Sequence, residues 1–172
     1  MTHPLFFLIG LFATSAFANW PSGATPFAKA KLEPKSETEV AGMVEFATRG
    51  KDLLVWIKVN NILAGDHGIH VHEKGDCGDP KAENAGGHFN PTGEKHGDPT
   101  GSHRHIGDFG NFHVEKDSAD TVLTIPNRAK KPFDWKYLLG RAVVVHQSKD
   151  DLKSQPSGNS GDRVACGVIE KL

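Results

Sequence analysis

The stretch Val40–Val59, VAGMVEFATRGKDLLVWIKV, contains two runs of alternating side chains on either side of a short turn. Successive residues of a strand point to opposite faces, so each run would present one apolar face to a core. In the second run that face consists of Leu53, Val55, Ile57 and Val59. The turn over 48–52 contains a glycine, and two alternating runs around such a turn predict a β-hairpin.

Strand-like runs continue along most of the chain outside this hairpin. We expect further strands at 26–32, 68–73, 111–116, 121–125, 141–146 and 163–169. A helical pattern is weak and confined to the region near 133–139. The 19 glycines and 10 prolines supply the turns that short strands require, and 172 residues suit one domain with a real core. The sequence therefore predicts an all-β fold, an antiparallel sandwich or barrel of about eight strands.

Two long segments, 74–110 and 147–162, interrupt these strands and are rich in turn-forming residues. Loops of this length without secondary structure are uncommon in compact domains and are usually functional or disordered. The first contains several histidines, and neither is a monotonous charge run. We therefore expect two long functional loops.

The charge balance gives no general reason to expect nucleic acid or an acidic membrane surface as a partner. Lys and Arg number 20, Asp and Glu number 21, and the formal net charge is −1. Any electrostatic function must come from local arrangement. We expect no membrane span in the mature domain, because no long apolar run occurs outside the N-terminal segment.

Residues 1–18 have the pattern of a secretory signal peptide. Residues 5–13 form a short apolar run, and Ala16-Phe17-Ala18 supplies a small-x-small cleavage pattern. Residues 1–4 lack Lys and Arg, and the alternative is a buried or membrane-anchoring helix, but the run is too short to span a bilayer. We expect cleavage after Ala18, which leaves 19–172 as an exported domain.

The sequence has two cysteines, Cys77 and Cys166. In an oxidising compartment they are a natural pair that would close a loop of 89 residues. Chain-entropy estimates for such a loop give about 4–5 kcal/mol of stabilisation. If the chain is not exported, two unrelated buried thiols are the better interpretation.

The 10 histidines cluster in a few short motifs. His70 and His72 flank Val71, so in a strand both imidazoles lie on one face and can reach one metal ion. His146 ends a Val-rich run at the mouth of the second loop. The first loop adds His88, His96, His105 and Asp108. Three imidazoles with a carboxylate are typical of a closed zinc site, and an all-imidazole set suits copper.

Five stretches resemble the motifs of copper/zinc superoxide dismutases: GIHVHEKGDC at 68–77, GGHFNP at 86–91, RHIGDFGN at 104–111, VVVHQSKDD at 143–151 and GNSGDRVACGVI at 158–169. They follow the family's order with close to its spacings, and the resemblance extends from about residue 24 to 170. It implies an eight-stranded Greek-key barrel that converts superoxide to O2 and hydrogen peroxide by alternate reduction and oxidation of copper.

The resemblance also implies two metal sites and the residues around them. The implied copper ligands are His70, His72, His88 and His146, and the implied zinc ligands are His88, His96, His105 and Asp108. His88 would bridge the metals and pass a proton to the nascent peroxide. Asp150 would link a copper-ligand and a zinc-ligand histidine, and Arg163 would hold the superoxide anion. Cys77 and Cys166 match the family's intrasubunit disulfide.

Several expectations concern the remaining histidines, the compartment and the partners. His67, His103 and His113 match no ligand position, and we expect them in turns or on the surface. Superoxide is the expected partner, and the signal pattern places the chain in the periplasm or outside the cell, with a second loop similar to that of bacterial periplasmic members. Family members occur as monomers and as dimers, so a homodimer stays open. The candidate lysines for steering the substrate are Lys74, Lys81, Lys149 and Lys153.

Two alternative functions stay open at this point. One is a non-enzymatic copper-chaperone or metal-buffering relative, although such domains often lack a ligand or the arginine, and this chain has all of them. The other is a zinc-stabilised sandwich without copper. Metal content and superoxide consumption separate these alternatives from the enzyme.

Overall fold

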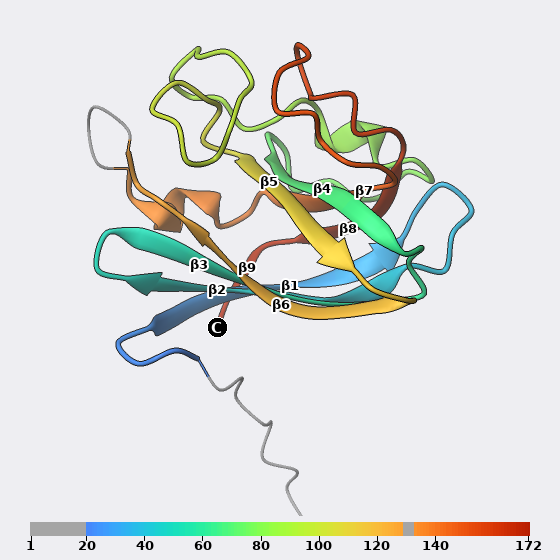
Figure 1. Cartoon of the computed structure of the whole chain (residues 1–172), viewed down its shortest axis with the longest axis horizontal. Coiled ribbons are helices and arrows are strands. Elements are labelled where there is room, and N and C mark those ends of the chain that lie inside the picture. Colours follow the sequence, from blue (N-terminus) through green and yellow to red (C-terminus); the bar gives the residue numbers. More distant parts are fainter. Residues whose placement is uncertain (1–19, 129–132) are drawn as a thin grey trace, which may run out of the picture.

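Nine strands and two short 3₁₀ helices form the fold within residues 20–128 and 133–172, which the computed structural model describes (Figure 1). The strands are β1 (Thr25–Pro34), β2 (Ala41–Arg49), β3 (Asp52–Asn60), β4 (Gly65–His72), β5 (Asp108–Val114), β6 (Ser118–Ile125), β7 (Ala142–His146), β8 (Arg163–Val168) and β9 (Glu170–Lys171). The 3₁₀ helices are η1 (Glu83–Ala85) and η2 (Trp135–Leu138). The predicted signal peptide, 1–18, lies outside the described residues.

The strands form a nearly closed antiparallel barrel. Their order is β5-β4-β7-β8-β1-β2-β3-β6, and β9 pairs with β1. Strand β1 joins the two halves, because it pairs with β2 along most of its length but with β8 only at Glu33 and Pro34. The predicted all-β class and the eight predicted strands are confirmed, with bounds that differ by a few residues, and β9 was not predicted.

The β2–β3 hairpin has the register that the alternating pattern predicts. Val44 pairs with Ile57 and Phe46 pairs with Val55, and these four side chains are fully buried. Gly50 in the connecting turn has a φ of 60°, a conformation that favours glycine. The hairpin therefore supplies one wall of the barrel core.

The core fills the space between the two halves of the barrel. Its largest fully buried side chains include Phe46, Phe109 and Leu138. Helix η2 lies where the weak helical pattern occurs, and Trp135 donates from Nε1 to the Lys51 carbonyl oxygen at 2.9 Å. This contact holds η2 against the β2–β3 turn.

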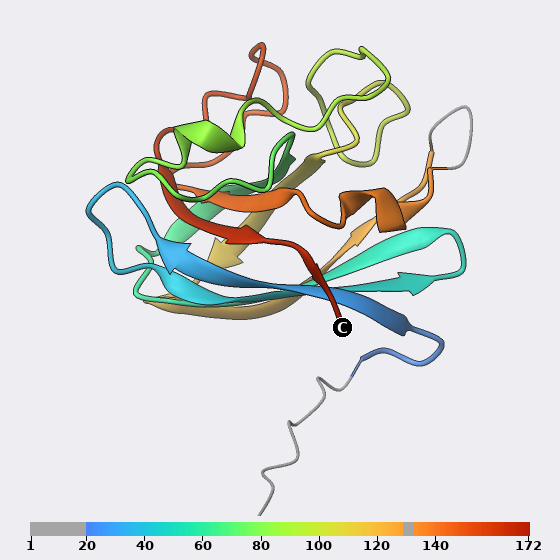
Figure 2. The ribbon, with the colours of Figure 1, turned by 180° about the vertical axis from the view of Figure 1, so that it is seen from behind.

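Both long loops, which follow β4 and β7, lie on the same side of the barrel, away from β1, β2 and β3 (Figures 1 and 2). The predicted disulfide is confirmed. Cys77 in the first loop is bonded to Cys166 in β8, with the two Cα atoms 5.7 Å apart. The bond therefore ties the first loop to the barrel wall. Among the described residues, none of the helices is long and apolar enough to span a membrane.

Candidate metal centre

Four histidine rings from three parts of the chain meet beside β4 and form what we call the first cluster. His70 and His72 lie on β4, His146 ends β7, and His88 comes from the first loop, where it forms an isolated β-bridge with His72. One nitrogen from each ring lies within 4.8 Å of the others, and all four residues are buried. The alternation of His70, Val71 and His72 thus places both β4 imidazoles on one face, as the sequence predicts.

In each ring of the first cluster one nitrogen makes a hydrogen bond, and the other, which we call free, has no partner among the described residues. His72 Nδ1 donates to the Gly86 carbonyl oxygen at 2.9 Å, and His146 Nδ1 donates to that of Gly161 at 3.3 Å. Among the described residues no partner exists for His70 Nδ1, His72 Nε2, His88 Nε2 and His146 Nε2. A buried polar atom without a partner is costly, and four such atoms converging on one place fit a bound cation.

The second cluster consists of His88, His96, His105 and Asp108, again with ligand atoms within 4.8 Å of one another. Asp108 begins β5, and its Oδ1 accepts from His88 Nδ1 at 2.8 Å and from His96 Nδ1 at 3.0 Å. His105 Nδ1 lies 3.3 Å from the same oxygen but outside hydrogen-bond geometry. Three imidazoles and one carboxylate around one point match the donor set of a closed zinc site.

His88 belongs to both clusters. Its Nε2 is one of the free nitrogens of the first cluster, and its Nδ1 faces Asp108 in the second. A single imidazole therefore separates the two places where cations fit.

Asp150, from the second loop, also joins the two clusters. Its Oδ2 accepts from His70 Nε2 at 2.8 Å, and its Oδ1 accepts from His96 Nε2 at 2.9 Å. Gly158 lies directly against this bridge with a φ of 69°, and an added Cβ would overlap the Asp150 carboxylate and lie 2.7 Å from His96 Nε2. A carboxylate that holds the outer nitrogen of a ligand ring fixes its orientation and tautomer.

Burial and neighbouring charges give the histidine rings of the two clusters different pKa values. Burial lowers the pKa of His70, His72 and His146 below the usual 6.5, and lowers the pKa of His88 to about 4. Burial acts in the same direction on His96, but hydrogen bonds to two carboxylates outweigh it and raise its pKa to about 9.

The two carboxylates show the complementary effect. Burial alone would raise the pKa of Asp108 and Asp150, but hydrogen bonds from the surrounding histidines outweigh burial and lower both. Both carboxylates are therefore ionised and can hold cations or protonated rings.

Arg163, at the start of β8, lines a cavity of about 390 Å³ together with His72, His88 and His146. Its guanidinium donates from Nη1 to the Ala82 carbonyl oxygen at 2.5 Å and from Nη2 to the Gly86 carbonyl oxygen at 2.8 Å. Gly86 therefore accepts from both Arg163 and His72, and this one carbonyl couples the arginine to the first cluster.

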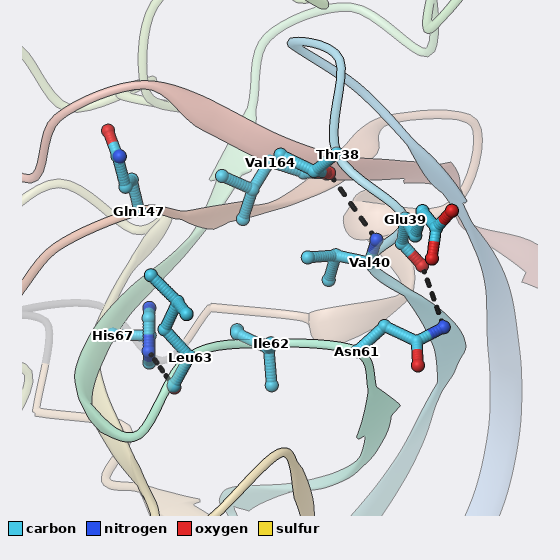
Figure 3. A pocket seen from close by; sticks show the side chains of 9 residues that line it. All are labelled: Thr38, Glu39, Val40, Asn61, Ile62, Leu63, His67, Gln147 and Val164. Atoms are coloured by element: carbon cyan, nitrogen blue, oxygen red, sulfur yellow. Dashed lines mark hydrogen bonds between the residues drawn. The ribbon is translucent and has the colours of Figure 1, made fainter.

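Of the three histidines that we expect in turns or on the surface, the expectation for His67 was wrong. His103 and His113 are exposed, but His67 is buried in β4. Its Nδ1 lies 2.9 Å from the His146 carbonyl oxygen and its Nε2 lies 2.8 Å from that of Leu63. His67 also lines a separate pocket of about 320 Å³ with apolar residues such as Ile62 and Val164 (Figure 3). The predicted strand began at 68, one residue too late to include it.

The fold and the two clusters together define a β-barrel metalloprotein with adjacent sites for two cations. A family model described as copper/zinc superoxide dismutase (SODC) matches residues 40–169, and the chain therefore belongs to this family. The described structure thus has the fold that the resemblance implied. The protein is an oxidoreductase whose substrate is superoxide and whose metals are copper and zinc.

Similar proteins include enzymes and a chaperone. The extracellular superoxide dismutase [Cu-Zn] of Caenorhabditis elegans is 40% identical over 141 residues, which cover 78% of this chain and 63% of the relative. The extracellular superoxide dismutase [Cu-Zn] of Haemonchus contortus is 38% identical, covering 76% of this chain and 74% of the relative. The copper chaperone for superoxide dismutase of Rattus norvegicus is 37% identical, but the match covers only 49% of that protein.

Proposed function

We propose that the first cluster holds copper, that the second holds zinc, and that superoxide is disproportionated at the copper site. The copper ligands are His70, His72, His88 and His146, and the zinc ligands are His88, His96, His105 and Asp108. The observation that carries the proposal is the position of His88, which directs one ring nitrogen to each cluster. A ring placed between two cations favours the deprotonated bridging form.

When bound, copper supplies one-electron redox chemistry and zinc supplies a fixed positive charge. The chain's own residues supply the proton path and the site for the anion. Two superoxide anions and two protons give one O2 and one hydrogen peroxide, so a proton donor is required beside the substrate. His88 lines the cavity, and its Nε2 would alternate between two roles: ligand to copper and, when free of the metal, the atom that holds the proton and delivers it to the substrate.

Arg163 is the proposed docking group for the anion. Two of its N–H groups are bound to the Ala82 and Gly86 carbonyl oxygens, which limits the orientations of the guanidinium. An arginine held in this way keeps further donors and its full charge for a small anion in the cavity. Its role is to orient superoxide beside the first cluster.

We also propose export through cleavage of the signal peptide after Ala18, to the periplasm or the extracellular space. Two observations support secretion: the Cys77–Cys166 disulfide, a bond that persists in oxidising compartments, and the names of the two nematode relatives, both extracellular. Mass spectrometry of the secreted protein should find Asn19 at the N-terminus, and a chain that still begins with Met1 would contradict the proposal. The lack of a nucleic-acid partner stays a prediction, and the choice between monomer and homodimer stays open.

The test of the proposed function is metal content by mass spectrometry, combined with superoxide consumption before and after removal of copper. We expect one copper and one zinc per chain, with activity lost on copper removal and restored on its return. A chaperone-like chain would bind copper without consuming superoxide, and a zinc-stabilised sandwich would contain zinc alone. Either result would contradict the proposal.

A further inference from the structure

The side chain of Gln155, in the second loop, pairs with the backbone of His96 in the first. The His96 N–H donates to Gln155 Oε1 at 2.9 Å, and Gln155 Nε2 donates to the His96 carbonyl oxygen at 2.9 Å. Only one orientation of the amide satisfies both bonds, because the reverse would place donor against donor and acceptor against acceptor. The side chain therefore pairs with His96 much as a neighbouring strand would.

This pairing meets the backbone needs of a buried residue. His96 is 4% exposed, and among the described residues both of its main-chain polar groups find their partner in Gln155. Gln155 Nε2 also donates to the Lys153 carbonyl oxygen at 3.0 Å, which holds the amide against its own loop. A buried backbone group without a partner is costly, so removal of this amide would release His96 from its position.

The second loop also holds the ring of His96. Asp150 accepts from His96 Nε2 at 2.9 Å, which leaves Nδ1 directed at Asp108 in the second cluster. Asp150 thus sets the rotation of the ring, and Gln155 sets the position of the backbone that carries it. The two contacts together fix the place of Nδ1.

We propose that Gln155 is a positioning residue that orders His96 for zinc before the metal arrives. The inference rests on the proposed zinc site. A ligand that is already held in place loses little conformational freedom on binding, whereas a loose ligand must be ordered at the expense of affinity. Gln155 therefore increases zinc affinity without touching the metal.

The test compares Gln155→Met and Gln155→Glu with the wild type and with Lys153→Ala, a control in the same loop. Within the described part of the chain, Lys153 takes part in this network only through its backbone. Methionine keeps the length of the side chain and removes both hydrogen bonds to His96, together with the one to the Lys153 carbonyl oxygen. Glutamate keeps the acceptor for the His96 N–H but presents a carboxylate to the His96 carbonyl oxygen. We expect neither variant to retain wild-type zinc affinity.

Two measurements are made: exchange of the His96 amide hydrogen in the metal-free protein by NMR, and the zinc dissociation constant by competition with a chromophoric chelator. For Gln155→Met we expect both the exchange rate and the zinc dissociation constant to rise about tenfold, as for the loss of one or two hydrogen bonds. Lys153→Ala should match the wild type in both.

A Gln155→Met protein with unchanged amide exchange and unchanged zinc affinity would overturn the inference while leaving the zinc site intact. Faster exchange with unchanged zinc affinity would also overturn it, because Gln155 would then support the loop alone. A wild-type chain that binds no zinc would overturn the proposed function itself. The failures of the two proposals are therefore distinguishable.

Discussion

The two clusters are built mainly from the same residue type and share His88, but their free ring nitrogens face different surroundings. In the first cluster the free nitrogens face one another without a carboxylate between them, and burial lowers the pKa of all four rings. In the second, Asp108 lies against three rings, and the pKa of His96 rises to about 9.

This difference shows that the surroundings, more than the residue type, decide how a histidine site receives a cation. The rings of the first cluster are neutral near pH 7, so in the zinc-free protein their free nitrogens can bind a metal without releasing a proton. In the second cluster His96 holds a proton that the metal must displace. The first cluster is also built largely from strands, and the second largely from a loop that other segments must hold in place.

The largest effect should come from the residue that the clusters share. His88→Ala removes a ligand atom from both clusters, so we expect loss of both metals. Activity should fall more than about 100-fold, which exceeds the effect of losing a residue that only hydrogen-bonds to a ligand. His146→Ala is the matched control, because it belongs to the first cluster alone and should lose copper while keeping zinc. Metal analysis of both variants checks this, and retention of both metals by His88→Ala would break the comparison.

Arg163 offers a way to separate substrate binding from metal binding at the first cluster. Arg163→Ile removes the charge that we propose for anion docking but no ligand atom, so we expect activity to fall on the order of 10- to 100-fold with both metals retained. The measurement is superoxide consumption per bound copper. Full activity in the correctly metallated variant would refute the docking role.

The pH dependence of metal affinity sharpens the contrast between the clusters. Because the pKa of His96 is raised to about 9, its protonated form predominates at neutral pH, and zinc must displace that proton. From pH 8 down to pH 6 we therefore expect zinc affinity of the metal-free protein to fall about tenfold per pH unit.

Copper affinity provides the internal control. The pKa values of the first-cluster rings lie below 6.5, so copper binding should change little between pH 8 and pH 7. Chelator competition at each pH measures both metals. If copper affinity and zinc affinity changed equally per pH unit, the two clusters would not differ in the proton that the metal must displace.

The smallest effect concerns the approach of superoxide to the first cluster. Lys153 lies in the second loop near Asp150, and Lys153→Glu should lower the rate about twofold at low ionic strength, with a smaller effect in high salt. Lys51→Glu, the same charge change on the β2–β3 turn, is the control. A rate and a salt dependence that match those of the wild type would exclude Lys153 from steering.

Local patterns carried much of the fold but only part of the clusters, whose full ligand sets came from the resemblance to a known family. Alternation over Val40–Val59 predicts the hairpin, and alternation over His70-Val71-His72 predicts two imidazoles on one face. Contacts between distant segments could not be predicted in this way. Gln155 and His96 are 59 residues apart, and only the folded loops bring them together.

The errors at strand ends have a similar cause. Strand β5 begins at Asp108 because it pairs with His70 across an irregularity in the β4–β5 ladder. Such a pairing depends on a partner strand and leaves no mark in the local alternation. The predicted strand therefore began at 111, and the aspartate was assigned to the loop.

None of the cluster residues comes from β1, β2, β3 or β6, which make up one half of the barrel. Exposed positions there, such as the paired Lys58 and Asp120, lie on strands that contribute no residue to either cluster. This half is therefore the natural place for surface immobilisation, crosslinking or a fluorescent label. A catalyst attached through these strands would keep its reactive side turned to the solution.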